Sequence, residues 1–213
     1  MTTRIEAIVY YDYMCPYAFR MLSLLTEMEQ IRVDLTVTWR FFSLEESNAV
    51  SRGQSADWHI WEQPLNYESV FGRPHRRILA PFLATYAASL QGPEALTRFR
   101  LAVFQAYHKE RQDISDPAVL LEIARQAALE LSGFTAHWQS AAARDHLRDE
   151  HLSGVDAGVF GTPTIIINGC EATYLRLSAL SENLEERHAC FEELVRTLTQ
   201  RPYLRELKRA SGV

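Results

Sequence analysis

The start of the chain constrains the fold most strongly, because it contains a strand, a helix and a second strand in quick succession. Residues 5–10 form a short β-branched and aromatic run, which predicts a buried strand. Apolar residues at helical spacing predict a helix over 16–30, with Pro16 at its first position, where the missing N–H costs nothing. Residues 34–42 alternate apolar and polar side chains and predict a second strand. A unit of this length requires two parallel strands with a right-handed connection.

The middle of the chain, residues 51–153, contains no convincing strand pattern. It begins with an aromatic, turn-rich stretch at 53–77, and the periodicity of apolar residues then predicts several helices. These helices are expected at 78–90, at 93–109, from Pro117 onward, and at 135–152 between Gly133 and Gly154. We therefore predict a helical insertion that forms a layer of its own.

Strand patterns return near the C-terminus. Residues 164–167 predict a strand, Asn168-Gly169 is a strong hairpin signal, and residues 172–177 would form the returning strand. An amphipathic helix is expected over 182–208, interrupted at Pro202. The chain is therefore predicted to be an α/β protein in which a helical segment interrupts the sheet-forming part.

Composition excludes several classes of function. Apolar residues make up 47% of the chain and charged residues 23%, which is ordinary for a globular enzyme. The net charge of −5 argues against nucleic acid as a partner, because phosphate binding requires a basic excess. We expect no membrane segment, since no apolar run is long enough, and a cytoplasmic location, since residues 1–13 lack the features of a secretory signal. The seven histidines show no metal-binding spacing, so no metal site is expected.

Cys15 is the most distinctive of the three cysteines, because it lies at the junction between the first predicted strand and helix. Free N–H groups and the helix dipole at such a position stabilise an anion, so the thiol is expected to have a pKa below that of free cysteine. An inert, buried thiol is the alternative interpretation of the same residue. Cys170 and Cys190 are expected to serve only in packing.

A second distinctive feature is the segment Gly161-Thr162-Pro163-Thr164, directly before the predicted strand at 164–167. Proline is tolerated at the first residue of a strand because it need not donate a ladder hydrogen bond. A cis peptide bond before Pro163 would mark a deliberate tight bend.

Together, these features resemble the DsbA-like branch of the thioredoxin superfamily. The resemblance rests on the strand, the Cys-Pro helix start, the helical insertion and the G-V-F-G-T-P-T motif that ends at Thr164. It is greatest for the FrnE-type dithiol–disulfide isomerases, which are related to kappa-class glutathione transferases and 2-hydroxychromene-2-carboxylate isomerases. The resemblance implies a discontinuous thioredoxin-fold domain (1–50 and 154–213) and a helical insertion domain (51–153).

The resemblance also implies roles for individual residues. Cys15 would be the attacking thiol, Pro163 the cis-proline beside it, and Thr162 the residue whose backbone pairs with a peptide or glutathione. Pro16 and Tyr17 occupy the positions between the two cysteines of the family. The second of those cysteines is replaced by Ala18 in this chain, which removes the local thiol that would resolve a mixed disulfide. Neither Cys170 nor Cys190 is expected to substitute for it.

Three functions remain open from the sequence. The first is an atypical monothiol oxidoreductase or isomerase acting on protein or small-molecule thiols and disulfides, with no bound cofactor and with glutathione or another external thiol as co-substrate. The second is a kappa-type glutathione-dependent transferase or isomerase, in which Cys15 would donate a hydrogen bond to the glutathione thiolate. The third is a peptide-binding module without catalysis. The aromatic stretch 58–71 and the basic residues at 73–77 could line a substrate groove. In the alternative interpretation, the aromatic residues belong to the core and the basic residues form a solvated surface.

Overall fold

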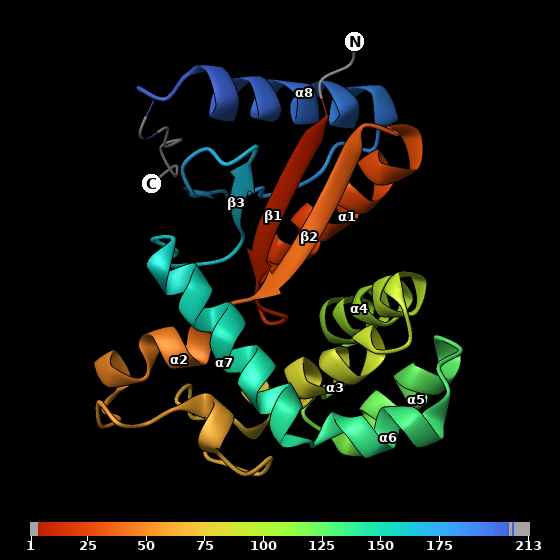
Figure 1. The fold of residues 1–213 in the computed structure, drawn as a ribbon, viewed down its shortest axis with the longest axis vertical. Helices are drawn as coiled ribbons and strands as arrows, with labels where there is room; N and C mark the ends of the chain where they lie inside the picture. The colour runs from red at the N-terminus through yellow and green to blue at the C-terminus, as the bar shows by residue number, and fades with distance from the viewer. Residues whose placement is uncertain (1–3, 205, 207–213) are drawn as a thin grey trace.

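The computed structural model describes residues 4–204 and 206. A four-stranded sheet and two helices, α1 (Pro16–Ile31) and α8 (Leu184–Gln200), form one part of the molecule, and the remaining helices form the other (Figure 1). Helix α7 (Ala141–Asp156) runs from the helical part back toward the sheet (Figure 1). None of the helices within the described residues is long and apolar enough to cross a membrane.

The sheet is mixed, with the strand order β2-β1-β3-β4. Strand β1 (Ile5–Tyr11) pairs in parallel with β2 (Leu35–Phe41), with Ile5 opposite Leu35, as the strand–helix–strand pattern predicts. Strand β3 (Thr164–Ile167) runs antiparallel to β1 on its other side, with Val9 opposite Ile165. The short strand β4 (Thr173–Tyr174) completes the sheet and leaves β2 as the opposite edge.

Helix α1 belongs to both parts of the protein because its apolar side chains cover two faces. Met21, Leu25 and Met28 pack beneath the sheet with the inward residues of β1 and β3. Ala18 and Leu22 instead join the core of the helical part. The first turn of α1 is thereby fixed where the two parts meet, at the C-terminal end of β1.

Among the described residues, the helical part is formed by helices α2 to α7 and a long irregular segment. The helices between α2 and α7 are α3 (Leu79–Ser89), α4 (Pro93–His108), α5 (Pro117–Gln126) and α6 (Leu131–Trp138). Helix α3 lies at the centre, and nine of its eleven residues are buried. The irregular segment follows α2 (Leu44–Asn48) and includes the 3-10 turns η1 (Val50–Arg52), η2 (Ile60–Glu62) and η3 (Pro74–Arg76).

The prediction of one helix over 135–152 is wrong, since two helices cover this region. The first ends at Trp138 with Gln139 as its C-cap, and Ser140 caps the second by accepting a hydrogen bond from the N–H of Ala143. The two glycines expected to bracket the helix lie inside α6 and α7 instead. Gly154 is needed for close packing, because a Cβ atom there would lie 2.8 Å from the Phe42 ring.

The C-terminal predictions are partly correct. Asn168 and Gly169 adopt φ values of 50° and 71°, as expected for a tight hairpin turn. The returning strand is shorter than the predicted 172–177 and consists of β4 alone. The final helix ends at Gln200, before Pro202, and residues 201–204 are not helical; residues 205, 207 and 208 of the expected continuation lie outside the described residues.

The observed architecture is the thioredoxin fold with a helical insertion, the fold class that the sequence predicts. The division into a discontinuous domain (1–50 and 154–213) and an insertion domain (51–153) stays a prediction. Helix α7 extends across the second of these boundaries.

Candidate active site

Cys15 is the N-cap residue of α1, with extended backbone dihedrals, and Pro16 follows at the first helical position. The turn before it is held by Asp12, whose backbone carbonyl accepts a hydrogen bond from the N–H of Cys15 at 3.1 Å. The buried Asp12 carboxylate also accepts from the N–H groups of Met14 and Leu44, both at 2.8 Å. Burial raises the pKa of Asp12 to about 7. The position of Cys15 is thus fixed by a buried carboxylate between β1 and α2.

The peptide bond between Thr162 and Pro163 is cis, and the fold brings it to Cys15. The Cys15 thiol donates a hydrogen bond to the carbonyl oxygen of Thr162 at 3.0 Å. Thr162 is only 2% exposed, and its side-chain hydroxyl is buried without a hydrogen-bond partner among the described residues. The structure therefore joins three of the residues singled out in the sequence, Cys15, Thr162 and Pro163, at one point.

The pKa of Cys15 differs from the sequence-based expectation. Burial raises this pKa, and the N–H groups of Ala18 and Tyr17 oppose the rise without reversing it. Cys15 is only 6% exposed, so the loss of hydration outweighs the stabilisation that the start of the helix offers a thiolate. Ala18, in the place of a resolving cysteine, is fully buried in the core of the helical part.

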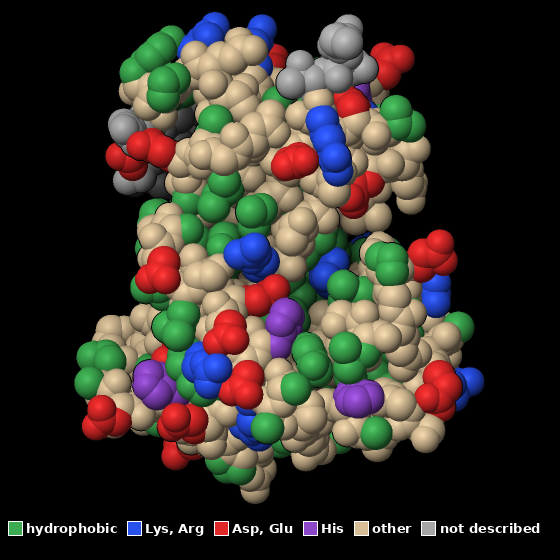
Figure 2. All heavy atoms as spheres, in the orientation of Figure 1, with side chains coloured by type: hydrophobic (Ala, Val, Ile, Leu, Met, Phe, Trp, Pro, Cys, Tyr) green, Lys and Arg blue, Asp and Glu red, His purple; other side chains and the backbone are tan. Residues whose placement is uncertain are grey.

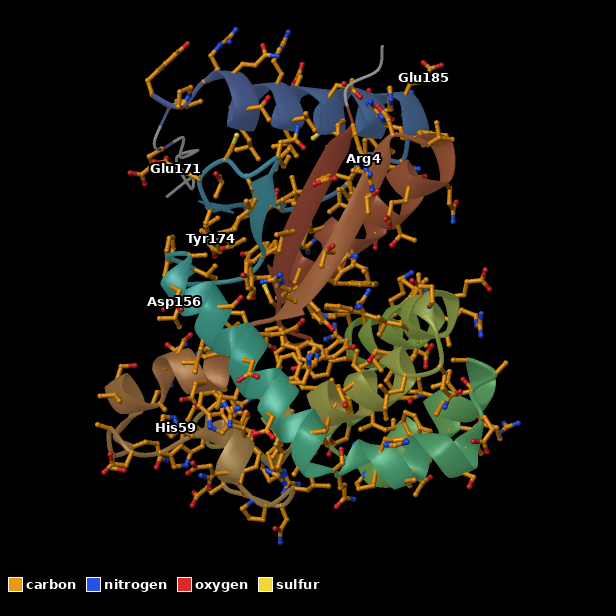
Figure 3. The ribbon with its side chains drawn as sticks, in the orientation of Figure 1. Arg4, His59, Asp156, Glu171, Tyr174 and Glu185 are labelled. Atoms are coloured by element: carbon orange, nitrogen blue, oxygen red, sulfur yellow. The ribbon has the colours of Figure 1, made fainter. Side chains whose placement is uncertain are left out.

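A partly exposed surface, here called the aromatic lip, adjoins Cys15 and the Thr162 loop. It consists of Tyr17, Phe160, Tyr174 and Arg176. The Arg176 guanidinium lies 4.6 Å from the centre of the Tyr17 ring and donates a hydrogen bond to the Tyr17 hydroxyl at 2.7 Å. Phe160 is 74% exposed, and its ring lies 5.2 Å from that of Tyr174, near the end of α7 that carries Asp156 (Figure 3).

The aromatic lip places a cation within electrostatic range of the thiol. Hydrogen bonding to Tyr17 raises the pKa of Arg176, with further contributions from the charges of Tyr17, Tyr174 and Cys15. Of the four lip residues, only Tyr17 was predicted from the sequence as a site residue. Phe160 could have been predicted as a site residue, because it directly precedes the Gly161-Thr162-Pro163 motif in the sequence. Tyr174 and Arg176 reach the site only through the β3–β4 hairpin.

A further side chain near the site, His108, comes from the end of α4. Its Nε2 atom lies 2.8 Å from the carbonyl oxygen of Tyr13, and its ring stacks on Phe19 with centroids 5.1 Å apart. Burial lowers the pKa of His108, so the ring is neutral at pH 7. The contact between His108 and the Tyr13 carbonyl connects the helical insertion to the loop before Cys15.

The remaining sequence candidates lie elsewhere. Cys170 follows β3 in the hairpin turn and Cys190 lies on α8, and both are free thiols. Trp61 and Tyr67 are core residues, and Tyr67 donates a hydrogen bond to the buried carboxylate of Glu45. The following basic residues are exposed or partly exposed: Arg73, His75, Arg76 and Arg77. Within residues 4–204 and 206, no three His, Cys, Asp or Glu side chains are grouped closely enough to hold a metal ion.

A cysteine at the first turn of a helix, facing a cis-proline loop beside a mixed sheet, defines a thioredoxin-fold protein with a thiol site. Comparison with known families agrees, since residues 6–185 match the DSBA-like thioredoxin domain. The chain belongs to this family. The uncharacterized protein Rv2286c of Mycobacterium tuberculosis is 27% identical over 160 residues, which cover 75% of this chain and 63% of that protein. The match thus spans less than two thirds of the length of this relative.

Solved structures support the fold at low sequence identity. A 2-hydroxychromene-2-carboxylate isomerase superposes with a TM-score of 0.63 at 15% identity, covering 90% of this chain and 97% of that one. A thioredoxin-like oxidoreductase from Silicibacter pomeroyi DSS-3 gives a TM-score of 0.56 at 15% identity, over 90% and 88% of the two chains. DsbA from Xylella fastidiosa gives 0.55 at 18% identity, over 91% and 86%. The fold is thus shared by oxidoreductases and an isomerase.

Proposed function

We propose that this protein is a monothiol thiol–disulfide oxidoreductase or isomerase in which Cys15 alone carries out the exchange. The observation that supports this most directly is the contact between the Cys15 thiol and the Thr162 carbonyl at 3.0 Å. The contact puts the sulfur beside the Thr162 loop, along which an extended substrate would bind from the aromatic lip. The partners would be protein or small-molecule disulfides.

The exchange would follow two balanced steps. The Cys15 thiol loses its proton to solvent, and the thiolate attacks one sulfur of a disulfide, which forms a mixed disulfide and releases the other sulfur as a thiolate. With Ala18 in place of a second cysteine, an external thiol such as glutathione would attack the mixed disulfide. That step releases Cys15 and forms a new disulfide between the external thiol and the substrate sulfur. Glutathione is proposed here as co-substrate, with no resident cofactor.

A second candidate function is supported by the protonation state of Cys15. Burial raises the pKa of this thiol, so near neutral pH it is mainly S–H and already acts as a hydrogen-bond donor. A protonated side chain at this position could donate to the thiolate of a bound glutathione, as in a kappa-type transferase or isomerase. Cysteine is a weak donor, and for that reason we rank this function second.

Two variants separate these candidates. In the monothiol mechanism, Cys15→Ser and Cys15→Ala both abolish reduction of hydroxyethyl disulfide by glutathione, because neither variant has a nucleophilic sulfur at position 15. In the transferase-like mechanism, Cys15→Ser retains or improves conjugation of glutathione to 1-chloro-2,4-dinitrobenzene, because serine is the better donor, whereas Cys15→Ala loses it. If the wild-type protein has neither activity but binds peptides saturably, the third function, a peptide-binding module without catalysis, is supported instead.

A further inference from the structure

A cleft lies between the free edge of β2 and the helical part, away from the cis-proline loop. It comprises two adjoining cavities of about 190 Å³ and about 320 Å³. The two cavities share the same three residues, Trp39 from β2 and Leu96 and Arg100 from α4. Hydrophobic, basic, acidic and histidine side chains surround a hollow between the two parts of the molecule in Figure 2.

Arg100 is the unusual residue of this cleft. It is only 5% exposed, yet it forms no ion pair with any described residue. Its Nε atom donates a long hydrogen bond, 3.4 Å, to the Tyr11 hydroxyl, and its guanidinium lies 5.6 Å from the Tyr11 ring and 5.8 Å from the Trp39 ring. The two terminal nitrogens have no hydrogen-bond partner among the described residues, and the side chain lines both cavities. A buried arginine normally has an anionic partner.

The edge of β2 supplies a second unpartnered donor in the same cleft. The N–H of Phe42 bonds to the Tyr11 carbonyl in the β1 ladder, so the alternate N–H groups of β2 point outward. Two of these outward groups are already occupied, since Val37 donates to the Glu29 carboxylate at 3.1 Å and Phe41 to Glu150 at 2.7 Å. The N–H of Trp39 lies between them and has no partner in the described part of the chain.

The charges around Arg100 limit the ligand that could occupy the cleft. The positive charges of Arg40 and Arg100 favour the ionised form of Glu150, and the charge of Arg100 also favours the ionised form of Glu29. His146, beside Glu150, is neutral at pH 7 because burial lowers its pKa. Glu29 and Glu150 act on Arg100 only through space, and one guanidinium beside two carboxyl groups can offset at most a single added negative charge, so the cleft excludes a phosphate dianion before a monoanion. The apolar walls, formed by the Trp39, Phe41 and Leu96 side chains, suit a flat or branched hydrocarbon body.

We infer that this cleft binds a small organic monocarboxylate, with its carboxylate on the Arg100 guanidinium and the Trp39 N–H and its apolar body against Trp39 and Leu96. The site is separate from Cys15 and does not depend on the proposed exchange reaction. A planar guanidinium pairs with a carboxylate through two parallel hydrogen bonds, which adds directional specificity to the charge.

Phenylacetate is a suitable probe, with the neutral phenylacetamide as its matched control. Titration into the ¹⁵N-labelled protein should give saturable shifts of the Trp39 amide resonance with phenylacetate and at least about tenfold weaker binding with phenylacetamide. Arg100→Gln should weaken phenylacetate binding by at least about tenfold. Arg98→Gln, on the exposed side of the same helix where Arg98 donates to the Ala127 carbonyl, should leave it unchanged.

A third variant covers the case in which Arg100→Gln does not fold. Leu96→Trp fills the wall shared by both cavities without removing the guanidinium, and it should also abolish binding. Cys15→Ser should not affect it. The inference is overturned if phenylacetate does not bind saturably, if phenylacetamide binds equally well, or if binding survives the Leu96 substitution. Shifts confined to residues 15–17 and 162–163 would overturn it as well, since they would place the carboxylate at the Cys15 site.

Discussion

The thiol of Cys15 and the carbonyl oxygen of Thr162 are 147 positions apart in the chain and 3.0 Å apart in space. This contact connects the start of α1 to the loop before β3, with the whole helical part inserted between them in sequence. It explains why a substrate bound along the Thr162 loop would meet the sulfur. It also explains why the sulfur is poorly hydrated, because the same loop covers it.

The titration of Cys15 should reflect this burial. In a Cys170→Ala, Cys190→Ala background, the rate of iodoacetamide alkylation should rise with a midpoint above that of free cysteine, because burial raises the pKa of the thiol. The same protein unfolded in urea should show the ordinary midpoint of about 8.5. A folded-state midpoint below the unfolded one would show that the helix dipole outweighs desolvation.

Arg176 should favour anionic substrates. Replacing it with Gln removes the cation of the aromatic lip, so the rate of reaction of Cys15 with glutathione disulfide should fall about two- to fivefold at low salt. The rate with the neutral hydroxyethyl disulfide should change less than about twofold. Arg148→Gln, a change at a partly exposed surface ion pair on α7, serves as the control. Equal losses with both disulfides would mean that Arg176 acts through structure and not through charge.

Glu150 should make the protein less stable as the pH rises. Burial raises its pKa to about 7 in the folded state, above the usual value of 4.5, so the fold favours the protonated form. The stability gained by protonation is complete below about pH 4.5 and is lost as the pH rises through 7, at a cost on the order of 2–3 kcal/mol.

Urea unfolding at pH 5 and pH 8 measures this effect. Glu150→Gln should flatten the pH dependence relative to the wild type, since glutamine can still accept from the Phe41 N–H without a charge. An exposed change on the same helix, Asp149→Asn, should leave the wild-type slope unaltered. If Glu150→Gln retains the full slope, other groups such as Asp12 carry the dependence.

Gly154 should not tolerate even a methyl group. In Gly154→Ala the new Cβ would lie 2.8 Å from the Phe42 ring and 3.0 Å from the Tyr10 ring, both of which are buried. Although alanine favours the helix, overpacking should lower the free energy of unfolding by about 1–3 kcal/mol. Leu152→Ala, at a position 44% exposed, should change it by less than about 0.5 kcal/mol. A stabilised Gly154→Ala protein would contradict the close packing of α7 on the sheet.

Local patterns in the sequence were sufficient for the strand–helix–strand unit, whereas the meeting of Cys15 with the Thr162-Pro163 loop was expected only from the resemblance to the DsbA-like family. The break at Ser140 was missed because the apolar periodicity continues through it and the evidence for a new helix is a single capping side chain. Gly154 was taken for a helix end, although its role is set by rings from β1 and from the segment after β2.

Charge environments were harder to predict, because they depend on tertiary burial. Glu45 resembles a surface charge in the sequence but is fully buried, and it accepts hydrogen bonds from Ser69 and from the N–H of Ile78. The pKa of Cys15 was expected to fall for a local reason, its place at a helix start, and it rises for a non-local one. Arg176 and Arg100 gained significance only from partners distant in the sequence.

Monothiol exchange at Cys15 is tested most directly by intact-mass analysis of the Cys170→Ala, Cys190→Ala protein after treatment with glutathione disulfide at mildly alkaline pH. We expect a single glutathione adduct on Cys15, complete removal of that adduct by reduced glutathione, and no adduct on the matching Cys15→Ser protein. Absence of the adduct under conditions in which iodoacetamide modifies Cys15 would contradict monothiol exchange, because the sulfur would then be accessible and ionised but unable to attack a disulfide.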